Sequence, residues 1–371
     1  MTTSKIAHFG LQRQYNNLKE ELLDATHEVL SSGVLMNGTF TYKFTKWLTN
    51  RVGCSHAVVT HSGTQALEIM ARYEKLAMLG MDESFELNQE YNLYRPTIRI
   101  PNLTYQATLN AFLTVGWDVS LIDTDENGLM LRNDKKRSDE YECLVGLYGA
   151  PPNINKLGSY VGPCVFVDGA QHWLSVRQNG IGLGMAISFD PTKNLPASGN
   201  GGAIVTDNIK LFNFALSYTN NGKPENHIQG TNSRMSELDC AHLLVRSRYI
   251  DKWQARRQSI RLYYIEHLKD LPIRCLSEGI ENHSDQKFVI YYSYRNALAK
   301  YLDSKGIETR IHYPCALSEL PLAKHIMIKP NSMMSTSILL SRGVLSLPIY
   351  PELTDAEVEN IVLNIKKYFD K

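Results

Sequence analysis

Two spacings of apolar residues alternate along the chain. Helical spacing runs from Leu18 to Val29, where Gly33 predicts the end of the helix, and it returns from Phe40 to Leu48. Short apolar or β-branched runs typical of strands follow at 56–60, 97–101, 118–123, 142–148, 164–168, 185–189 and 202–206. Several show little alternation, as expected for strands buried on both faces. With helical or loop segments between them, these runs predict a three-layer α/β/α architecture around a mostly parallel sheet.

The last third of the chain predicts a second, smaller unit. A long helical region runs from Ser236 to about Asp270, and its apolar spacing loosens at the charged cluster 252–257. Beyond it follow a strand, a helix and the capping box of a final amphipathic helix, at 287–292, 295–306 and Thr354–Glu357 respectively. We therefore expect a large domain with an N-terminal arm over residues 1–250 and a small C-terminal α+β domain over residues 251–371.

Net charge gives no support for a nucleic-acid partner or an anionic membrane. The 371 residues include 39 Lys and Arg against 38 Asp and Glu, a formal net charge of +1. The amino-terminal segment has no apolar run of signal-peptide length, and no stretch approaches ~20 apolar residues. We expect neither partner.

The cysteines indicate a reducing compartment. They lie at positions 54, 143, 164, 240, 275 and 315, and none belongs to a C-x-x-C pair. This spacing favours buried thiols over a zinc site or structural disulfides. We expect a cytoplasmic protein that binds no metal.

Three segments carry residues suited to one chemistry, and the first is HSGTQAL. Ser62, Gly63 and Thr64 lie between a predicted strand and a predicted helix. Free backbone N–H groups and the helix dipole meet at such a junction, and the two hydroxyls add donors, which suits a phosphate. By itself, such a tripeptide is more often only a helix cap.

The second and third segments supply a carboxylate and a lysine. In CVFVDGAQHW, Asp168 ends an apolar strand, where it can either pair with a pyridinium nitrogen or cap the next turn. In ISFDPTKNLPASGNGGAIVTD, Lys193 follows a strand and precedes a glycine-rich stretch. A lysine in that setting can form a Schiff base if its amine is partly neutral, although a lone lysine is usually solvated. Ser188 can add a hydroxyl to the phosphate site.

In this order, the three segments resemble the DegT–StrS family of sugar aminotransferases, which has the aspartate-aminotransferase fold. Other stretches resemble that family too, namely FGLQRQY, IPNLTYQAT, LYGAPPNINKL, GTNSRMSEL, IHYPCAL and LSLPIYPELT. The resemblance covers nearly the whole chain. It implies pyridoxal 5′-phosphate (PLP) as the cofactor, with pyridoxamine phosphate as its aminated form.

The resemblance also implies roles around the cofactor ring. Lys193 would form the Schiff base and carry the proton between the cofactor and the amino-acid α-carbon. Asp168 would pair with the ring nitrogen, Gln171 would lie near the phenolic oxygen, and Tyr105 would stack on the ring.

Further roles follow at the two ends of the cofactor site. Ser62, Gly63, Thr64 and Ser188 would hold the phosphate, and Asn232 would reach it from the partner subunit of a homodimer. Arg310, His312 and Tyr313 would lie on the acceptor side. Arg310 departs from the family pattern, as do His172 and Trp173 and a surface insertion expected at 77–94.

The implied reaction moves an amino group from L-glutamate to the carbonyl of a keto or aldehyde sugar for bacterial surface polysaccharide. The acceptor would be a nucleotide-linked keto-deoxysugar or a sugar acid such as 8-oxo-3-deoxy-octulosonate. One alternative is a sugar dehydratase, which has histidine in place of the Schiff-base lysine, so that Lys193 counts against it. Another is a regulatory protein that keeps the fold without catalysis. A cysteine desulfurase would need Cys315 as its nucleophile.

Overall fold

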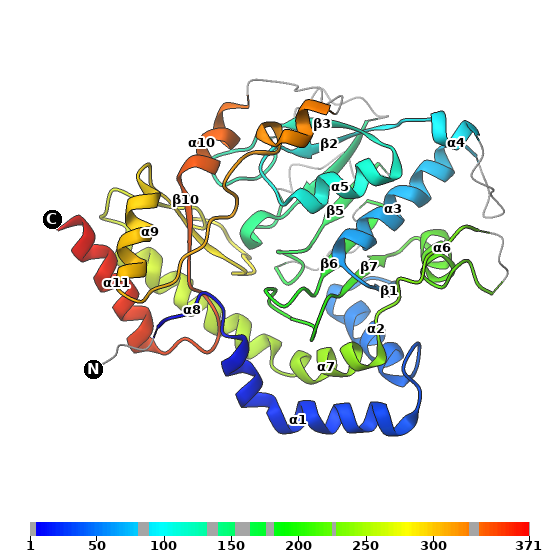
Figure 1. The fold of residues 1–371 in the computed structure, drawn as a ribbon, viewed down its shortest axis with the longest axis horizontal. Coiled ribbons are helices and arrows are strands. Elements are labelled where there is room, and N and C mark those ends of the chain that lie inside the picture. The colour runs from blue at the N-terminus through cyan, green and yellow to red at the C-terminus, as the bar shows by residue number, and fades with distance from the viewer. Residues whose placement is uncertain are drawn as a thin grey trace.

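Seven strands form one sheet in the larger part of the molecule (Figure 1). The computed structural model describes residues 5–80, 89–131, 140–152, 164–175, 182–224, 228–325 and 334–370. The strands are β1 (His56–Thr60), β2 (Thr97–Pro101), β3 (Asp118–Ile122), β4 (Tyr141–Val145), β5 (Val165–Asp168), β6 (Gly184–Ser188) and β7 (Gly202–Thr206). Their order is β1-β7-β6-β5-β4-β2-β3. Only the two pairs that include β7 are antiparallel, so the prediction of a mostly parallel sheet is confirmed.

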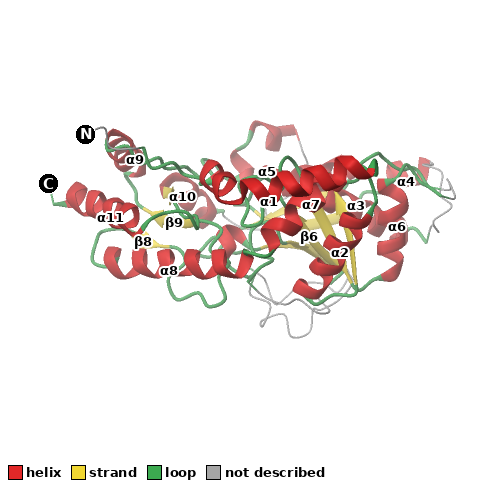
Figure 2. Ribbon diagram, turned by 90° about the horizontal axis from the view of Figure 1, so that it is seen from below, coloured by secondary structure: helices red, strands yellow, loops and turns green. Residues whose placement is uncertain are grey.

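Helices cover both faces of this sheet and form one layer on each side of the strands (Figure 2). They are α1 (Leu11–Ser32), α2 (Thr39–Val52), α3 (Gly63–Met78), α4 (Gln89–Leu93), α5 (Gln106–Val115), α6 (Ile209–Thr219) and α7 (Glu237–Ser247). One core joins the strands to α3, α5 and α6, and another joins them to α1, α2 and α7. Neighbouring residues of one strand enter different cores, as Val58 and Val59 of β1 do. Strands buried on both faces explain the apolar runs without alternation.

A three-stranded antiparallel sheet forms the smaller unit. Its order is β10 (Val344–Leu347), β9 (Phe288–Tyr291) and β8 (Arg274–Cys275). The helices that pack on it are α8 (Ile250–Leu268), α9 (Arg295–Ser304) and α11 (Asp355–Phe369), while α10 (Ser335–Gly343) leads into β10. The predicted capping box is present, because Thr354 Oγ1 accepts from the Glu357 N–H and the Glu357 carboxylate accepts from the Thr354 N–H.

One helix and the N-terminal segment connect the two units. Trp253, near the start of α8, packs in a core of the seven-stranded sheet, whereas Tyr264 packs in the core of the smaller unit. Ile6 also belongs to the smaller unit's core, and its N–H donates to the Gly306 carbonyl at 2.8 Å. A division of domains at residue 250 stays a prediction.

Two predicted boundaries were wrong. The strand expected at 142–148 ends at Val145, and Leu147–Gly149 forms a 3-10 turn. His172 packs directly against Gly146, where a Cβ would lie 2.0 Å from His172 Nδ1, so only glycine fits at the residue that follows the strand. The long helix expected after Ser236 is two helices that break at Arg248 and Tyr249, ahead of the charged cluster 252–257.

The insertion expected at 77–94 is only partly visible. Residues 81–88 lie outside the described residues, and the remainder holds the end of α3 and the short helix α4. Among the helices that the structure describes, none is long and apolar enough to cross a membrane.

Candidate active site

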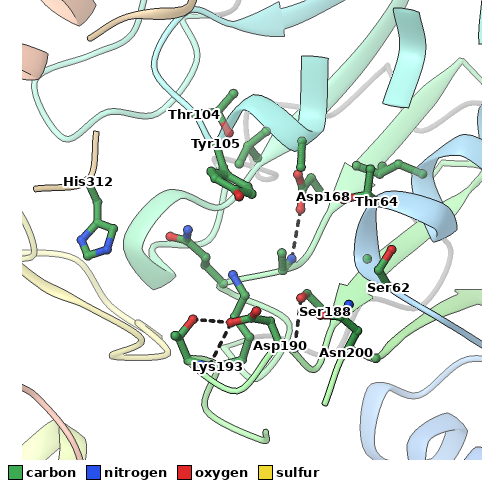
Figure 3. Close-up of a pocket in the computed structure, with 18 of the residues that line it drawn as sticks. Ser62, Thr64, Thr104, Tyr105, Asp168, Ser188, Asp190, Lys193, Asn200 and His312 are labelled. Carbon is green, nitrogen blue, oxygen red and sulfur yellow. Dashed lines mark hydrogen bonds between the residues drawn. The ribbon is translucent and has the colours of Figure 1, made fainter. Parts of the chain in front are cut away.

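A cavity of about 550 Å³ opens at the carboxyl ends of β5 and β6 and reaches segments of the smaller unit (Figure 3). Ten of the residues expected in the site line it: Ser62, Gly63, Thr64, Tyr105, Asp168, Gln171, Ser188, Lys193, His312 and Tyr313. In Figure 3, Ser62 and Thr64 lie at one end, His312 lies at the other, and Asp168 and Lys193 lie between them. The site is therefore assembled from both units.

The first turn of α3 forms one end of the cavity. Ser62 caps the helix, and its Oγ accepts from the Gln65 N–H at 3.1 Å. The N–H groups of Gly63 and Thr64 belong to the first turn, where backbone donors have no partner within the helix and the dipole favours an anion. Ser188, at the end of β6, and Asn200, in the loop before β7, also lie at this end (Figure 3).

Two glycines let three backbone segments meet at this end. A Cβ on Gly63 would lie 2.9 Å from Ser188 Cβ, and one on Gly202 would lie 2.3 Å from the Ser62 carbonyl carbon. Only hydrogen atoms fit at such distances. The N-terminus of α3 is therefore held directly against β6 and β7, in a cradle suited to a phosphate.

Asp168 presents a buried carboxylate at the end of β5. Its Oδ2 accepts from Thr108 Oγ1 at 2.7 Å, and its Oδ1 accepts from the Ala170 N–H at 3.1 Å. Burial raises the pKa of Asp168, an effect opposed by these two hydrogen bonds and by the charge of Lys193. A cationic N–H donor placed against this carboxylate would favour its ionised form.

Lys193 lies on a tight turn just after β6. Asp190 holds the turn: its Oδ1 accepts from the Thr192 N–H at 2.9 Å, and its carbonyl accepts from the Lys193 N–H at 2.8 Å. Burial lowers the pKa of the Lys193 amine, and the charges of Asp168 and Asp190 offset part of this shift. A lowered pKa increases the neutral, nucleophilic fraction of the amine.

Gln171 connects the two units behind Lys193. Its Oε1 accepts from the Tyr148 N–H at 2.6 Å, and its Nε2 donates to the Tyr313 hydroxyl at 3.0 Å. The Tyr105 ring lies 5.6 Å from the Tyr313 ring, centroid to centroid, and is 58% exposed. The two rings therefore form an aromatic surface beside the cavity, and the exposed Tyr105 ring is available to stack on a planar ligand.

His312 forms the far wall and is uncharged. Its Nδ1 lies 2.8 Å from Ser346 Oγ. Burial, followed by the charge of Lys287, lowers the pKa of His312 to about 2. At neutral pH this imidazole therefore serves as a neutral hydrogen-bonding group.

Two expected site residues do not line the cavity. Arg310 is exposed, and its guanidinium pairs with the Glu308 carboxylate. Asn232 is exposed as well, and its Oδ1 accepts from Arg234 at 3.2 Å. In this chain neither side chain joins the residues around Lys193.

Four lining or supporting residues were missed by the sequence analysis: Thr108, Asp190, Asn200 and Lys287. Asp190 and Asn200 lie within the quoted segment around Lys193, and their side chains could have been considered there. Thr108 sits on α5 and ends the quoted stretch IPNLTYQAT, so that stretch was its signal. Lys287 begins a predicted strand, and a charged residue heading an otherwise apolar run was its only signal.

The aminotransferase family model of DegT, DnrJ, EryC1 and StrS matches residues 16–366. The chain belongs to this family. Its members are PLP-dependent, so the predicted cofactor is confirmed, and the chain is a PLP-dependent sugar aminotransferase by family. The buried lysine, the buried carboxylate and the anion cradle described above fit that cofactor.

Relatives and solved structures agree along the whole chain. A dTDP-3-amino-3,4,6-trideoxy-α-D-glucose transaminase of Streptomyces venezuelae is 27% identical, over 100% of this chain and 97% of its own. The erythromycin biosynthesis sensory transduction protein EryC1 of Saccharopolyspora erythraea is 29% identical, over 97% and 99%. The crystal structure of S. venezuelae DesV with a ketimine intermediate superposes with a TM-score of 0.85 at 25% identity, covering all of both chains.

Proposed function

We propose that this enzyme moves an amino group from L-glutamate to the carbonyl of a nucleotide-linked keto-deoxysugar. A sugar acid such as 8-oxo-3-deoxy-octulosonate is the other acceptor class, and surface polysaccharide is the expected destination. The observation that carries the proposal is the placement of Lys193 and Asp168 in one cavity beside the N-terminus of α3. The transaminase named among the relatives acts on a dTDP-linked sugar, which supports the nucleotide-linked class.

The residues of the cavity divide the work of holding PLP. Ser62, Gly63, Thr64 and Ser188 would bind the phosphate, and Asp168 would accept from the ring nitrogen. Bound PLP supplies an electron sink for the electrons of the α-carbon–hydrogen bond. Tyr105 would cover one face of the ring, and Gln171 would donate to the phenolic oxygen.

Lys193 has two tasks that follow from its surroundings. Its amine, made more nucleophilic by burial, would attach the cofactor covalently. Once an amino acid displaces it, the freed amine would take the α-proton and return it to the cofactor side. Asp168 and Asp190 would stabilise its protonated form between these transfers.

We also propose that two copies of the chain form the working enzyme. Helix α1 and the segment before α2 expose Leu23, Leu30, Val34 and Leu35, and Tyr42 of α2 is 66% exposed. Large apolar side chains exposed on neighbouring elements favour a contact with another protein over contact with solvent. Asn232, exposed and outside its own cavity, would then reach the phosphate in the site of the partner.

The test follows the two half-reactions separately. PLP-loaded protein should lose its yellow absorbance when L-glutamate is added, with 2-oxoglutarate released. A panel of keto-sugar nucleotides and sugar-acid aldehydes, incubated with enzyme and isotopically labelled glutamate, should give one product that carries the label by mass. A protein whose absorbance no amino acid changes would instead be a non-catalytic, regulatory member of the fold.

A further inference from the structure

A second lysine enters the cavity from the smaller unit. Lys287 immediately precedes β9, is 5% exposed and lines the cavity with Lys193. Its Nζ lies 5.7 Å from the centre of the Phe9 ring. Among the described residues, no carboxylate lies within ion-pair distance of this ammonium. Asp190 is the acid whose charge it senses, and the Asp190 side chain already accepts from the Thr192 N–H and hydroxyl.

The surroundings of Lys287 are short of negative charge. Burial lowers its pKa well below the usual value, and the charges of Lys193 and Arg257 add to the effect. The two imidazoles nearby, those of His8 and His312, are also held neutral, in part by the charge of Lys287. Burial therefore disfavours the ammonium form of Lys287 while no anion lies beside it, and an anion bound in the cavity would stabilise that charged form.

The position of Lys287 is fixed by both units. Its backbone N–H donates to the Tyr148 carbonyl at 3.0 Å, and Gln286 Nε2 donates to the Thr192 carbonyl at 2.8 Å. Asn194 Nδ2 donates to the Ser284 carbonyl at 2.6 Å. These bonds tie the segment before β9 to the turn that carries Lys193. The backbone segments that carry the two lysines are therefore held in a set relation, as a preorganised binding site requires.

We propose that Lys287 binds the α-carboxylate of the amino donor. The inference rests on the proposed function. In an amino acid, the α-carboxylate is two bonds from the nitrogen that replaces the Lys193 amine, so it must lie close to Lys193. The diphosphate of a nucleotide-linked acceptor is separated from the reacting carbonyl by several ring atoms. The charge of Lys287 acts on the imidazole of His312, and His312 lies at the end of the cavity opposite Ser62 and Thr64 of the phosphate cradle (Figure 3).

The experiment compares donors that differ in their carboxylates. Wild-type protein and the variants Lys287→Met, Lys287→Gln and Lys300→Met are loaded with PLP. Lys300 is an exposed lysine on α9 and serves as the matched control. The absorbance change is followed with L-glutamate, L-alanine and γ-aminobutyrate, which lacks an α-carboxylate. The dissociation constant and the rate at saturation are measured for each, together with binding of the unreactive ligand acetate.

The expected result is a change in affinity for α-carboxylates alone. Both Lys287 variants should raise the dissociation constants of L-glutamate and L-alanine by roughly tenfold or more, because a charged hydrogen bond is lost. The rate at saturation, the weak reaction of γ-aminobutyrate and the half-reaction with acceptor should change little. Lys300→Met should match wild type. In wild-type protein, acetate should compete with L-alanine, a measurement that needs no folded variant.

Several outcomes would overturn the inference. Unchanged dissociation constants for both amino acids, equal losses with γ-aminobutyrate, a loss confined to the acceptor half-reaction or no competition by acetate would each do so. Failure of the proposed function is distinguishable, because the wild-type protein would then respond to no amino acid. If wild type responds to L-glutamate and Lys287→Met matches it, only the role of Lys287 falls.

Discussion

Lys193 and Asp168 have separable tasks, although they share one cavity and sense one another's charge. Replacing Lys193 by alanine should abolish covalent attachment of the cofactor. The fold should stay intact, because the turn is held by Asp190 and the lysine side chain takes no part in it. Borohydride reduction followed by intact-protein mass spectrometry should add the cofactor mass to wild type only. A Lys193→Ala protein that still gains this mass would assign the Schiff base to another lysine, with Lys287 as the nearest candidate.

Asp168→Asn should leave PLP bound but lower turnover by roughly 100-fold or more, as expected when a fixed charge that stabilises the reacting state is removed. The phosphate cradle is untouched, whereas the ring nitrogen loses the carboxylate that keeps it protonated. Thr108→Val is the matched control, since it removes the 2.7 Å hydrogen bond to Oδ2, together with a 3.3 Å contact to Thr104 Oγ1, and keeps the carboxylate. Turnover and bound cofactor are measured together. Near-normal turnover in Asp168→Asn would leave Asp168 with a structural role only.

Arg310 is the residue whose predicted role depends most on what the acceptor carries. Its guanidinium is exposed and paired with Glu308, so an anionic acceptor would have to compete for it. Arg310→Ala should therefore raise the acceptor KM by only a few-fold, with the glutamate half-reaction unchanged. Arg342→Ala, which removes another exposed arginine from an ion pair, should affect neither half-reaction. Equal effects on both half-reactions, or on neither, would remove Arg310 from the acceptor site.

At the scale of elements, the phosphate cradle at α3 depends on close contact between the backbone at Ser62 and the backbone of β7 at Gly202. A Cβ on Gly202 would lie 2.3 Å from the Ser62 carbonyl carbon, and backbone cannot move aside as a flexible side chain can. Gly202→Ala should therefore push α3 away from β7, weaken cofactor binding and destabilise the fold by about 1–3 kcal/mol. Gly199→Ala, in the same loop with open space around it, is the control. Cofactor affinity and urea unfolding test this, and equal affinities in the two variants would contradict it.

The elements best predicted from sequence are those set by local patterns. The strand at 202–206 and the end of α1 at Gly33, whose φ is 68°, follow from apolar spacing and glycine alone. The turn after Val145 interrupts a continuous apolar run, so apolar spacing does not predict it, and the packing of His172 against Gly146 joins residues that are distant in sequence. Helix α8 passes from one core to the other between Trp253 and Ile260, beyond the break at Tyr249, and this passage is also a property of the assembled fold.

Some residues of the site could be predicted from the sequence and others could not, again because local patterns reveal only residues within a continuous segment. Continuous sequence segments contain Lys193, Asp168 and the Ser62–Thr64 turn, and the residues next to them in those segments indicate their roles. Lys287 belongs to no such segment, since it reaches the cavity only because the stretch before β9 crosses to Tyr148 and Thr192. Local patterns therefore do not reveal a residue whose place depends on contacts between the two units.

At the scale of the whole molecule, the remaining prediction concerns how two chains share their sites. Asn232 is exposed, lies outside its own cavity and forms an isolated antiparallel bridge with Asn220. If it serves the partner's phosphate, twofold symmetry creates two equivalent composite sites. Asn232→Asp would place a carboxylate against that phosphate and should inactivate the enzyme, as Lys193→Ala does.

Mixing these two inactive variants distinguishes the arrangements. When Asn232 acts on the partner's site, a mixed dimer carries both defects in one site and leaves the other native. With equal amounts and free exchange of subunits, half of the dimers are mixed and half of their sites are native, so about a quarter of wild-type activity should return. When Asn232 serves its own chain, every site of a mixed dimer keeps one defect. Activity measured against the fraction of mixed dimer decides between the two, and no recovery despite proven exchange would refute the shared site.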